Sequence, residues 1–316
     1  MSAAPQSVIF YDMMGPMFIN TFSSHYRGKY GKAVGKIALD RGVACPNRKN
    51  GGCIYCAPKS FRPYYLKEGE TLHEQIRKGK EFLKRRKFSC YFAYFQQETT
   101  TAAPCDELIA DFNLVLADPL CVGLIVSTRP DYLEDRLLDA LNSLAGDSSR
   151  PKEIILELGL QSTHDRSLVL LNRNHTRADF MQAVQRLRTR KYLHIGVHLI
   201  LGIPGEVFAD MLATVQAVCE AGVEHMKIHH LQVIEGTELE KMYRQRPFTT
   251  FDVHEYMDIV SRLLMSVPSH VVMHRLWSIS ATGIIIAPFW DLSQFEMGKL
   301  LRQTLFLTDR RQGKLV

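Results

Sequence analysis

The stretch VGKIALDRGVACPNRKNGGCIYC, residues 34 to 56, decides the expected fold of this chain. Its first part, VGKIALD (34 to 40), is apolar and partly β-branched, as is typical of a buried strand. The loop that follows carries three cysteines, Cys45, Cys53 and Cys56. If the strand belongs to a parallel sheet, this loop lies at the carboxyl edge, where α/β proteins place their functional sites.

Six further apolar runs follow this strand and alternate with amphipathic segments that have helical periodicity. The expected strands cover residues 34 to 40, 89 to 95, 121 to 128, 152 to 160, 194 to 202, 225 to 234 and 270 to 276. The expected helices cover residues 72 to 86, 106 to 117, 133 to 145, 178 to 190, 208 to 222 and 253 to 267. Strands and helices in alternation build a parallel sheet covered by helices, because right-handed crossovers return each helix to the sheet.

Six or seven such units in one series predict an α/β fold, a partial (β/α)6-type TIM-like barrel. We assign residues 1 to 33 to an N-terminal extension, 34 to 280 to the barrel, and 281 to 316 to a C-terminal extension that packs on the barrel. A doubly wound Rossmann sheet is the alternative, but no G-x-G-x-x-G follows an expected strand.

The composition is that of an ordinary globular protein, with 316 residues of which 46% are hydrophobic. The first residues lack the pattern of a signal peptide, and the apolar run IGVHLILGIPG (195 to 205) is too short to span a bilayer. We therefore expect a cytoplasmic protein with no membrane partner. The seven cysteines are odd in number, and the four outside the loop are scattered, which argues against a disulfide framework.

The formal net charge is +6, and basic residues cluster at positions 84 to 87, 186 to 191 and 310 to 314. Such clusters can follow a phosphate backbone, so a nucleic-acid partner is permitted. For the first two clusters we favour a simpler interpretation as solvated helix ends, since cations stabilise the last turn of a helix.

The spacing of the three cysteines, C-x7-C-x2-C, is compatible with two metal sites. A structural zinc site needs four ligands. Candidates for a distant fourth zinc ligand are His25, His73 and Cys90. A [4Fe-4S] cluster held by only three thiolates leaves one iron open for an external ligand, and an open iron suits the carboxyl edge of a barrel, where chemistry occurs.

The sequence resembles the radical S-adenosylmethionine (SAM) enzymes, and among them the YhcC-like group, relatives of the catalytic subunit of Elongator. The resemblance runs from about Phe18 to Leu300. The motifs that carry it are GKIALDRGVACPNRKNGGCIYC, YFAYFQQETTTAAP, GLIVSTRPDYL, LELGLQSTHDRSLVLLNRNH, HLILGIPGE, KIHHLQVIEGTELEKMY and HRLWSISATGIIIAPFW.

The resemblance implies that Cys45, Cys53 and Cys56 hold a [4Fe-4S] cluster whose fourth iron is chelated by SAM. One electron, from a flavodoxin- or ferredoxin-type donor, then yields methionine and a 5′-deoxyadenosyl radical that abstracts hydrogen from a substrate. Elongator-type enzymes modify the wobble uridine of tRNA, so tRNA is our first candidate substrate. The alternatives are a small-molecule or peptide substrate, or a non-catalytic binding module stabilised by zinc.

The same resemblance implies cofactor contacts outside the cysteines. It places Tyr55 near the adenine of SAM and Gln96 near its methionine end, although many relatives have GGE where this chain has FQQ. Ile200 and Gly202 lie at the strand end where adenine stacks in relatives. Glu157 and Gln161 are further cofactor-binding candidates.

Glu157, Gly159 and Gln161 occupy alternate positions of one expected strand, so they share a face, which we assign to the barrel interior. A buried carboxylate needs a partner, either a bound ligand or a lysine such as Lys227 or Lys36. The candidate catalytic residues are Glu157, Lys227, His230 and Arg275. Strand alternation means that His229 and His230 cannot both face inward.

Three further features concern the same edge of the expected barrel. Arg129 could bind a carboxylate or phosphate of a ligand, or pair with Asp131. Asn174 stands in NRNH where relatives have glycine, a change that Asn tolerates in the left-handed region. Relatives usually follow HRL with a T-G-D type loop, whereas this chain has WSISATG (277 to 283), so the radical chemistry is better supported than any shared substrate.

Overall fold

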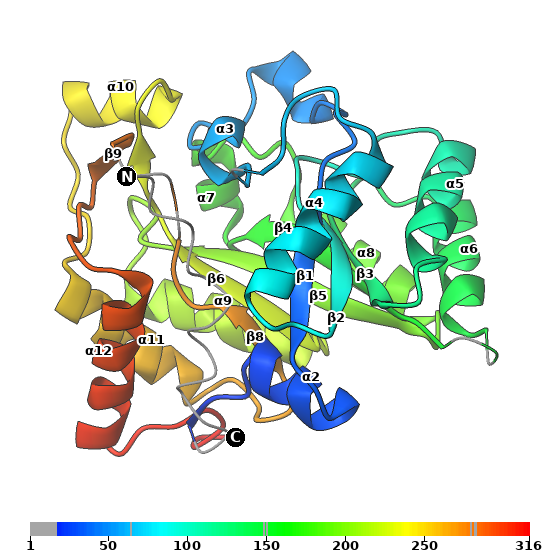
Figure 1. Ribbon diagram of the computed structural model, residues 1–316. Coiled ribbons are helices and arrows are strands. Elements are labelled where there is room, and N and C mark those ends of the chain that lie inside the picture. The colour runs from blue at the N-terminus through cyan, green and yellow to red at the C-terminus, as the bar shows by residue number, and fades with distance from the viewer. Residues whose placement is uncertain (1–17, 64, 148, 150, 279, 281–282) are drawn as a thin grey trace.

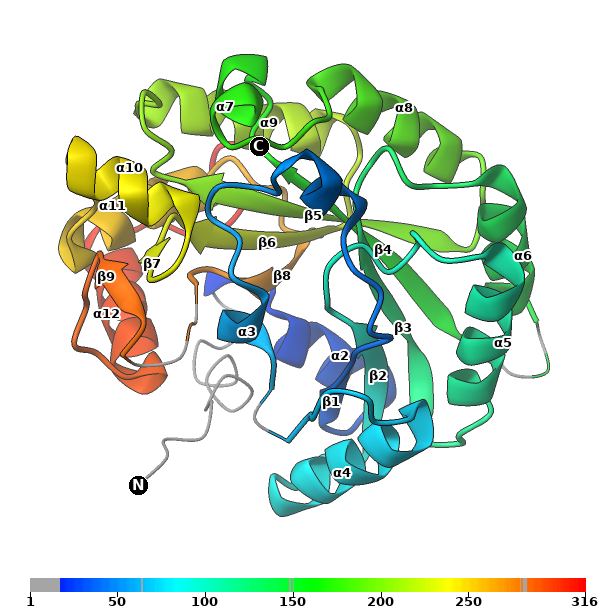
Figure 2. The ribbon, with the colours of Figure 1, turned by 90° about the horizontal axis from the view of Figure 1, so that it is seen from above.

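Seven parallel strands form one curved sheet in the computed structural model. The structure describes residues 18–63, 65–147, 149, 151–278, 280 and 283–316 (Figure 1). Neighbouring strands follow the order β1-β2-β3-β4-β5-β6-β8. Their bounds are β1 (Val34–Leu39), β2 (Cys90–Phe95), β3 (Cys121–Thr128), β4 (Glu153–Gln161), β5 (Leu193–Leu201), β6 (His225–His230) and β8 (Val272–Arg275). Seen from above, the strands form an arc open on one side, which confirms the predicted partial barrel (Figure 2).

Helices cover the convex face of the arc (Figure 2). The main covering helices are α4 (Leu72–Arg85), α5 (Cys105–Leu116), α6 (Asp135–Ala145), α8 (Arg177–Arg188), α9 (Phe208–Glu220) and α11 (Val253–Leu264). Each was expected from its periodicity, and α4 and α8 begin with capping boxes at Thr71 and Thr176. Their apolar faces and the outward side chains of the strands form the largest hydrophobic core.

A helix that the periodicity did not predict, α2 (Phe22–Tyr30), fills the amino-terminal end of the half-barrel. Its Phe22 and Tyr26 rings pack against Phe92 of β2, with centroid distances of 5.6 and 4.7 Å. The Tyr26 and Tyr30 hydroxyls donate hydrogen bonds to Glu153 at the start of β4. The interior is therefore closed at this end by aromatic side chains, and the chemistry must use the carboxyl end.

The strand expected over residues 225 to 234 was wrong in its second part. β6 ends at His230, and Val233 and Ile234 form a separate strand, β7, which pairs antiparallel with β9 (Ile285–Ala287). The helix α10 (Glu238–Gln245) follows. Hydrophobicity indicated burial of these residues correctly, but they are buried in a small cluster with Leu239 and Ala287 rather than in the main sheet.

The two ends of the described chain meet at the same side of the sheet. α12 (Gln294–Leu307) packs on α11, and the residues after it reach Phe18, because the Gln312 backbone N–H donates to the Phe18 carbonyl oxygen at 2.9 Å. Residues 1–17 of the expected N-terminal extension and residues 279, 281 and 282 of WSISATG lie outside the described residues. In the part of the chain that is described, no helix has the length and apolarity needed to cross a membrane.

Candidate functional site

The cysteine loop lies across the carboxyl ends of the strands (Figure 2). After β1 it forms a short 3-10 helix, η2 (Pro46–Asn50), and then turns at Gly51 and Gly52, whose φ angles of 85° and 74° favour glycine. The loop is anchored on the segment that follows α7 (Asp165–Leu170), since the Asn172 side chain donates to the carbonyl oxygens of Asn50 and Gly52 at 2.8 and 2.7 Å. This anchoring holds all three cysteines above the barrel interior.

Hydrogen-bond donors face two of the three sulfur atoms. Thr99 Oγ1 donates to Cys45 Sγ at 3.1 Å, and Asn47 Nδ2 and Arg173 Nη1 donate to Cys53 Sγ at 3.3 and 3.2 Å. Three thiols in one loop, with a cation and neutral donors at their sulfurs, fit an anionic iron-sulfur cluster. Among the described residues, no three His, Cys, Asp or Glu side chains lie close enough together to hold one metal ion.

Cys56, the third cysteine, is partly buried, as are Cys45 and Cys53. Burial, together with the neighbouring Cys53, raises the pKa of the Cys56 thiol to about 12. Coordination to a metal deprotonates a thiol outright, so binding of an iron-sulfur cluster would overcome the raised pKa of Cys56.

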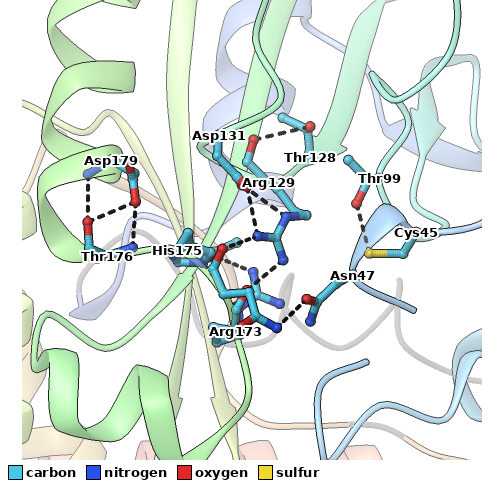
Figure 3. A network of polar contacts seen from close by, with 12 residues as sticks. Cys45, Asn47, Thr99, Thr128, Arg129, Asp131, Arg173, His175, Thr176 and Asp179 are labelled. Carbon is cyan, nitrogen blue, oxygen red and sulfur yellow. Dashed lines mark hydrogen bonds and ion pairs between the residues drawn. The ribbon is translucent and has the colours of Figure 1, made fainter. Parts of the chain in front are cut away.

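Arg173 connects the cysteine loop to the sheet. Its buried guanidinium also donates to Tyr55 Oη at 3.2 Å and to the carbonyl oxygen of Gly159 on β4. Arg129 supports this segment, with Nη1 donating to the Arg173 carbonyl oxygen at 2.6 Å (Figure 3). Arg129 also forms a two-bond ion pair with Asp131 at 2.9 and 2.8 Å, which decides the alternative left open by the sequence in favour of pairing.

Asn174 follows Arg173 and has a φ angle of 52°. It therefore adopts the left-handed conformation that we expected where relatives have glycine. Its side-chain Nδ2 donates to Asn47 Oδ1 at 2.7 Å, so the asparagine also contacts the cysteine loop.

A cavity of about 240 Å³ runs from the cysteine loop into the barrel. Most of the predicted site residues line it, namely Cys45, Cys53, Tyr55, Cys56, Gln96, Glu157, Gln161, Ile200, Lys227, His230 and Arg275. Gly202 is placed differently. A Cβ atom there would lie 2.7 Å from the Phe251 ring, and its φ angle is +82°, so Phe251 and the turn explain the glycine without a cofactor.

Glu157 lies at the centre of the polar interior. Its Oε2 atom accepts hydrogen bonds from His198 Nε2 at 2.7 Å, Lys227 Nζ at 3.2 Å and Ser127 Oγ at 3.1 Å. Its Oε1 atom accepts one from His274 Nδ1 at 2.8 Å. A carboxylate only accepts, so each histidine nitrogen that faces it carries a proton. The sequence left open whether a bound ligand or a lysine pairs with Glu157, and the structure shows a pair with Lys227.

The side chains around Glu157 have charges that burial alone would not allow. Burial raises the pKa of Glu157, but Lys227 and His198 outweigh this effect and hold the pKa well below its usual range. Burial lowers the pKa of Lys227 to about 8, with Glu157 opposing and Arg275 adding to the decrease. Burial and the Lys227 charge lower the pKa of His198 to about 4. At neutral pH the interior thus holds a carboxylate, a protonated lysine and neutral imidazoles.

The two histidines at the end of β6 point to opposite faces, as strand alternation requires. The His229 ring lies 5.8 Å from the His198 ring, on the face that carries Lys227. The His230 ring packs 5.2 Å from Tyr256 and 4.0 Å from the Trp290 ring. Of the pair, His229 therefore faces the Glu157 cluster, whereas His230, our candidate catalytic residue, packs against α11 and the C-terminal segment.

Sequence reasoning missed several residues of this site, chiefly His198, Tyr94 and Arg173. His198 precedes the candidate Ile200 by two positions on β5, and Tyr94 precedes the candidate Gln96 by two positions. Strand alternation could therefore have identified both. Arg173 had no such signal, because its position depends on how the 171–174 segment folds over β4.

The chain belongs to the radical SAM superfamily. Residues 41–218 match this superfamily, and residues 223–306 match the radical SAM C-terminal domain. The chain is 32% identical to an uncharacterized protein of Methanocaldococcus jannaschii, over 92% of this chain and 90% of that protein. It is also 32% identical to protein YhcC of Escherichia coli, over 86% of this chain and 87% of YhcC.

Two further similarities concern Elongator-type proteins. The chain is 30% identical to the tRNA uridine(34) acetyltransferase of Methanocaldococcus infernus, over 52% of this chain but only 30% of that protein. The solved structure of the archaeal Methanocaldococcus infernus Elp3 with an N-terminal deletion matches with a TM-score of 0.66 at 20% identity, over 88% of this chain and 64% of that one. This structural likeness shows a shared fold. Radical SAM enzymes in general use SAM, a [4Fe-4S] cluster and an electron donor.

Proposed function

We propose that this protein is a radical SAM enzyme in which Cys45, Cys53 and Cys56 hold a [4Fe-4S] cluster. The observation that carries the proposal is the thiol loop, with Arg173 and Asn47 donating to Cys53, placed at the rim of a cavity that reaches a polar interior. A cluster of this type supplies the electron that cleaves SAM to methionine and a 5′-deoxyadenosyl radical, which then abstracts a hydrogen atom.

The cavity lining supports a division into two regions. Tyr55 and Gln96 lie at the level of the cysteine loop, as do Gln161 and Ile200 at the ends of β4 and β5, and we assign these four residues to SAM. The Tyr55 ring is held by the bond from Arg173 to its hydroxyl. Glu157, Lys227 and Arg275 belong to the polar interior, and we assign them to the substrate.

The first test is anaerobic reconstitution with iron and sulfide, followed by dithionite and SAM. Wild type should bind about four iron atoms per chain and release 5′-deoxyadenosine. Cys53→Ala should lose both properties. Cys219→Ala is the matched control, because Cys219 lies on α9 outside the cavity lining, and it should behave as wild type. Zinc in place of iron, or an intact cluster that never cleaves SAM, would contradict the proposal.

Modification of the tRNA wobble uridine is our first candidate for the reaction, supported by the similarity to a tRNA uridine(34) acetyltransferase over half of the chain. The basic clusters offer it little support. α4 ends at Arg85 before β2, and α8 ends at Arg188 before β5, so both clusters lie at the amino ends of the strands, opposite the cavity. Arg186 and Arg190 also pair with Asp135 on α6, at 3.0 and 2.9 Å.

The RNA candidate is tested by incubating reconstituted enzyme, reduced flavodoxin or ferredoxin, and SAM with a tRNA pool, and by mass analysis of the nucleosides. A mass change at the wobble uridine that depends on Cys53 would support it. If tRNA binds no better than another polyanion and no nucleoside changes, a small-molecule or peptide substrate replaces RNA. Exchange of Lys84 and Arg85 for glutamine should leave a true tRNA reaction unaffected.

A further inference from the structure

The charges that line the cavity do not balance. The cationic side chains are Arg129, Arg173, Lys227 and Arg275, and the carboxylates are Glu98 and Glu157. Arg129 is paired with Asp131, Arg173 faces Cys53, and Glu98 is paired with Arg48 at 2.9 Å. Among the described residues, the inner part of the cavity is therefore left with two cations, Lys227 and Arg275, and one carboxylate, that of Glu157.

Arg275 is a lining cation for which the described residues supply no partner. Within the described part of the chain, its guanidinium has no hydrogen bond and no ion pair, although the residue is half-buried and lines the cavity. It lies beside Lys227, because the two residues are register partners across β6 and β8. The charge of Arg275 contributes to the lowered pKa values of Lys227 and His229, which shows that these groups lie within electrostatic range of one another.

A half-buried guanidinium facing a cavity without a counterion is costly unless a ligand supplies the opposite charge. We propose that Arg275 and Lys227 form a subsite that binds an oxyanion of the substrate, a carboxylate or a phosphate group. Arg275 offers a planar fork that can hold two oxygens of one anion, and Lys227 offers a point charge on the same side. His229 and Ser278 also line this region, with 3.4 Å between Nδ1 and Oγ, and add neutral donors.

That the anion belongs to a substrate rests on the proposed function. Binding of an anion at Arg275 and Lys227 does not. A second source of the same chemistry is the carboxylate of SAM. Arg275 lies on β8, at the opposite end of the arc from β1, the strand that leads into the cysteine loop, and this position favours the substrate. The loop itself is anchored both on the segment after β4 and on Leu239 of α10. The binding experiment therefore distinguishes a substrate oxyanion from the SAM carboxylate.

The probe is inorganic phosphate, titrated calorimetrically into the anaerobically reconstituted full chain at constant ionic strength, with and without SAM. Wild type should bind phosphate saturably, and SAM should leave the phosphate Kd unchanged. Arg275→Gln should weaken binding about tenfold or more, since a hydrogen-bonded charge is removed. Arg275→Lys keeps the charge without the fork and should fall between the two. Arg311→Gln, at an exposed arginine outside the cavity, has the same change in net charge and should match wild type.

Three results would overturn the proposal. The first is that wild type shows no saturable phosphate binding. The second is that wild type and Arg275→Gln, both folded by circular dichroism, have equal phosphate Kd values. The third is competition between phosphate and SAM, which would assign Arg275 to the SAM carboxylate. The variant Cys53→Ala separates the anion subsite from the radical SAM function, because it should lose the iron-sulfur cluster and keep phosphate binding. A protein that binds phosphate through Arg275 but never cleaves SAM contradicts the proposed function alone.

Discussion

At the scale of single residues, Arg173 does the most to shape the environment of the cysteines. It is buried, and its guanidinium contacts Cys53 Sγ, the Tyr55 hydroxyl and the Gly159 carbonyl oxygen together. A cation that donates to a cluster ligand stabilises the reduced cluster, which carries the greater negative charge.

We therefore predict that Arg173→Gln lowers the reduction potential of the cluster, and that Arg173→Lys, which keeps the charge, lowers it less. A redox titration of the reconstituted proteins followed by electron paramagnetic resonance measures this. Arg177→Gln, an exposed arginine four positions along the chain, is the control and should leave the potential unchanged. An intact cluster with the wild-type potential in Arg173→Gln would contradict the prediction.

Gly202 and Gly205 form a natural comparison. Both have positive φ angles, of 82° and 87°, but a Cβ atom at Gly202 would meet the Phe251 ring whereas at Gly205 nothing lies within 4 Å. We expect Gly205→Ala to lower the free energy of unfolding by about 1–2 kcal/mol, the cost of the left-handed conformation. Gly202→Ala should lose a further ~1–3 kcal/mol from overpacking. Urea unfolding measures both, and Phe251→Leu should reduce the excess. Equal losses for the two alanine variants would show that Phe251 does not restrict this position.

At the scale of elements, β6 separates the two environments of the site. Its alternate residues His225, Lys227 and His229 face the interior, and His230 packs between β6 and α11. Burial lowers the pKa of His230 to about 3, far below that of a histidine in an unfolded chain.

This packing predicts a loss of stability in acid. The unfolded chain binds a proton at residue 230 below about pH 6.5, whereas the folded chain does not, so the free energy of unfolding falls as the pH falls from 7 to 5. For His230 the loss is about 2 kcal/mol over this interval. His230→Gln should lack this part of the pH dependence, and His254→Gln, at an exposed histidine of α11, should retain it. Urea unfolding at both pH values tests this, and parallel losses in wild type and His230→Gln would count against it.

At the scale of the whole molecule, the residues after α12 close the fold at the amino ends of the strands. The buried side chain of Gln312 donates to the carbonyl oxygens of Pro268 and Val271, both at 2.8 Å, and accepts from the Asn20 N–H at 2.9 Å. One side chain thereby connects the start of the described chain, the entry to β8 and the tail.

We predict that Gln312→Ala destabilises the protein by about 2 kcal/mol or more, because buried backbone groups lose their partners. Gln303→Ala, at an exposed position of α12, should change stability by less than about 0.5 kcal/mol. Thermal unfolding of the two variants makes the comparison. Similar melting temperatures for both would mean that the tail does not contribute to stability.

The periodicity of the chain was sufficient for the main architecture. All seven strands of the sheet and its covering helices were expected within a few residues, because burial on both faces of a parallel strand and on one face of a helix leaves a local pattern. α2, α7, α10, α12 and β9 were not expected, and the residues of β7 were expected as the end of β6. The apolar residues of α2 fill the end of a barrel and those of β7 pair with a strand some fifty residues later, and neither fact is encoded nearby in the chain.

By itself, the sequence determined the parallel half-barrel, the cysteine loop at its carboxyl edge and the family of the protein, since spacing and periodicity are local properties. Only the tertiary structure decided which charges meet. Glu157 pairs with Lys227 and His198, and Arg173 donates to Cys53. Gly202 lies against the Phe251 ring. Arg275 faces the cavity without a partner among the described residues. These contacts join residues far apart in the chain, and the curvature of the sheet brings them together.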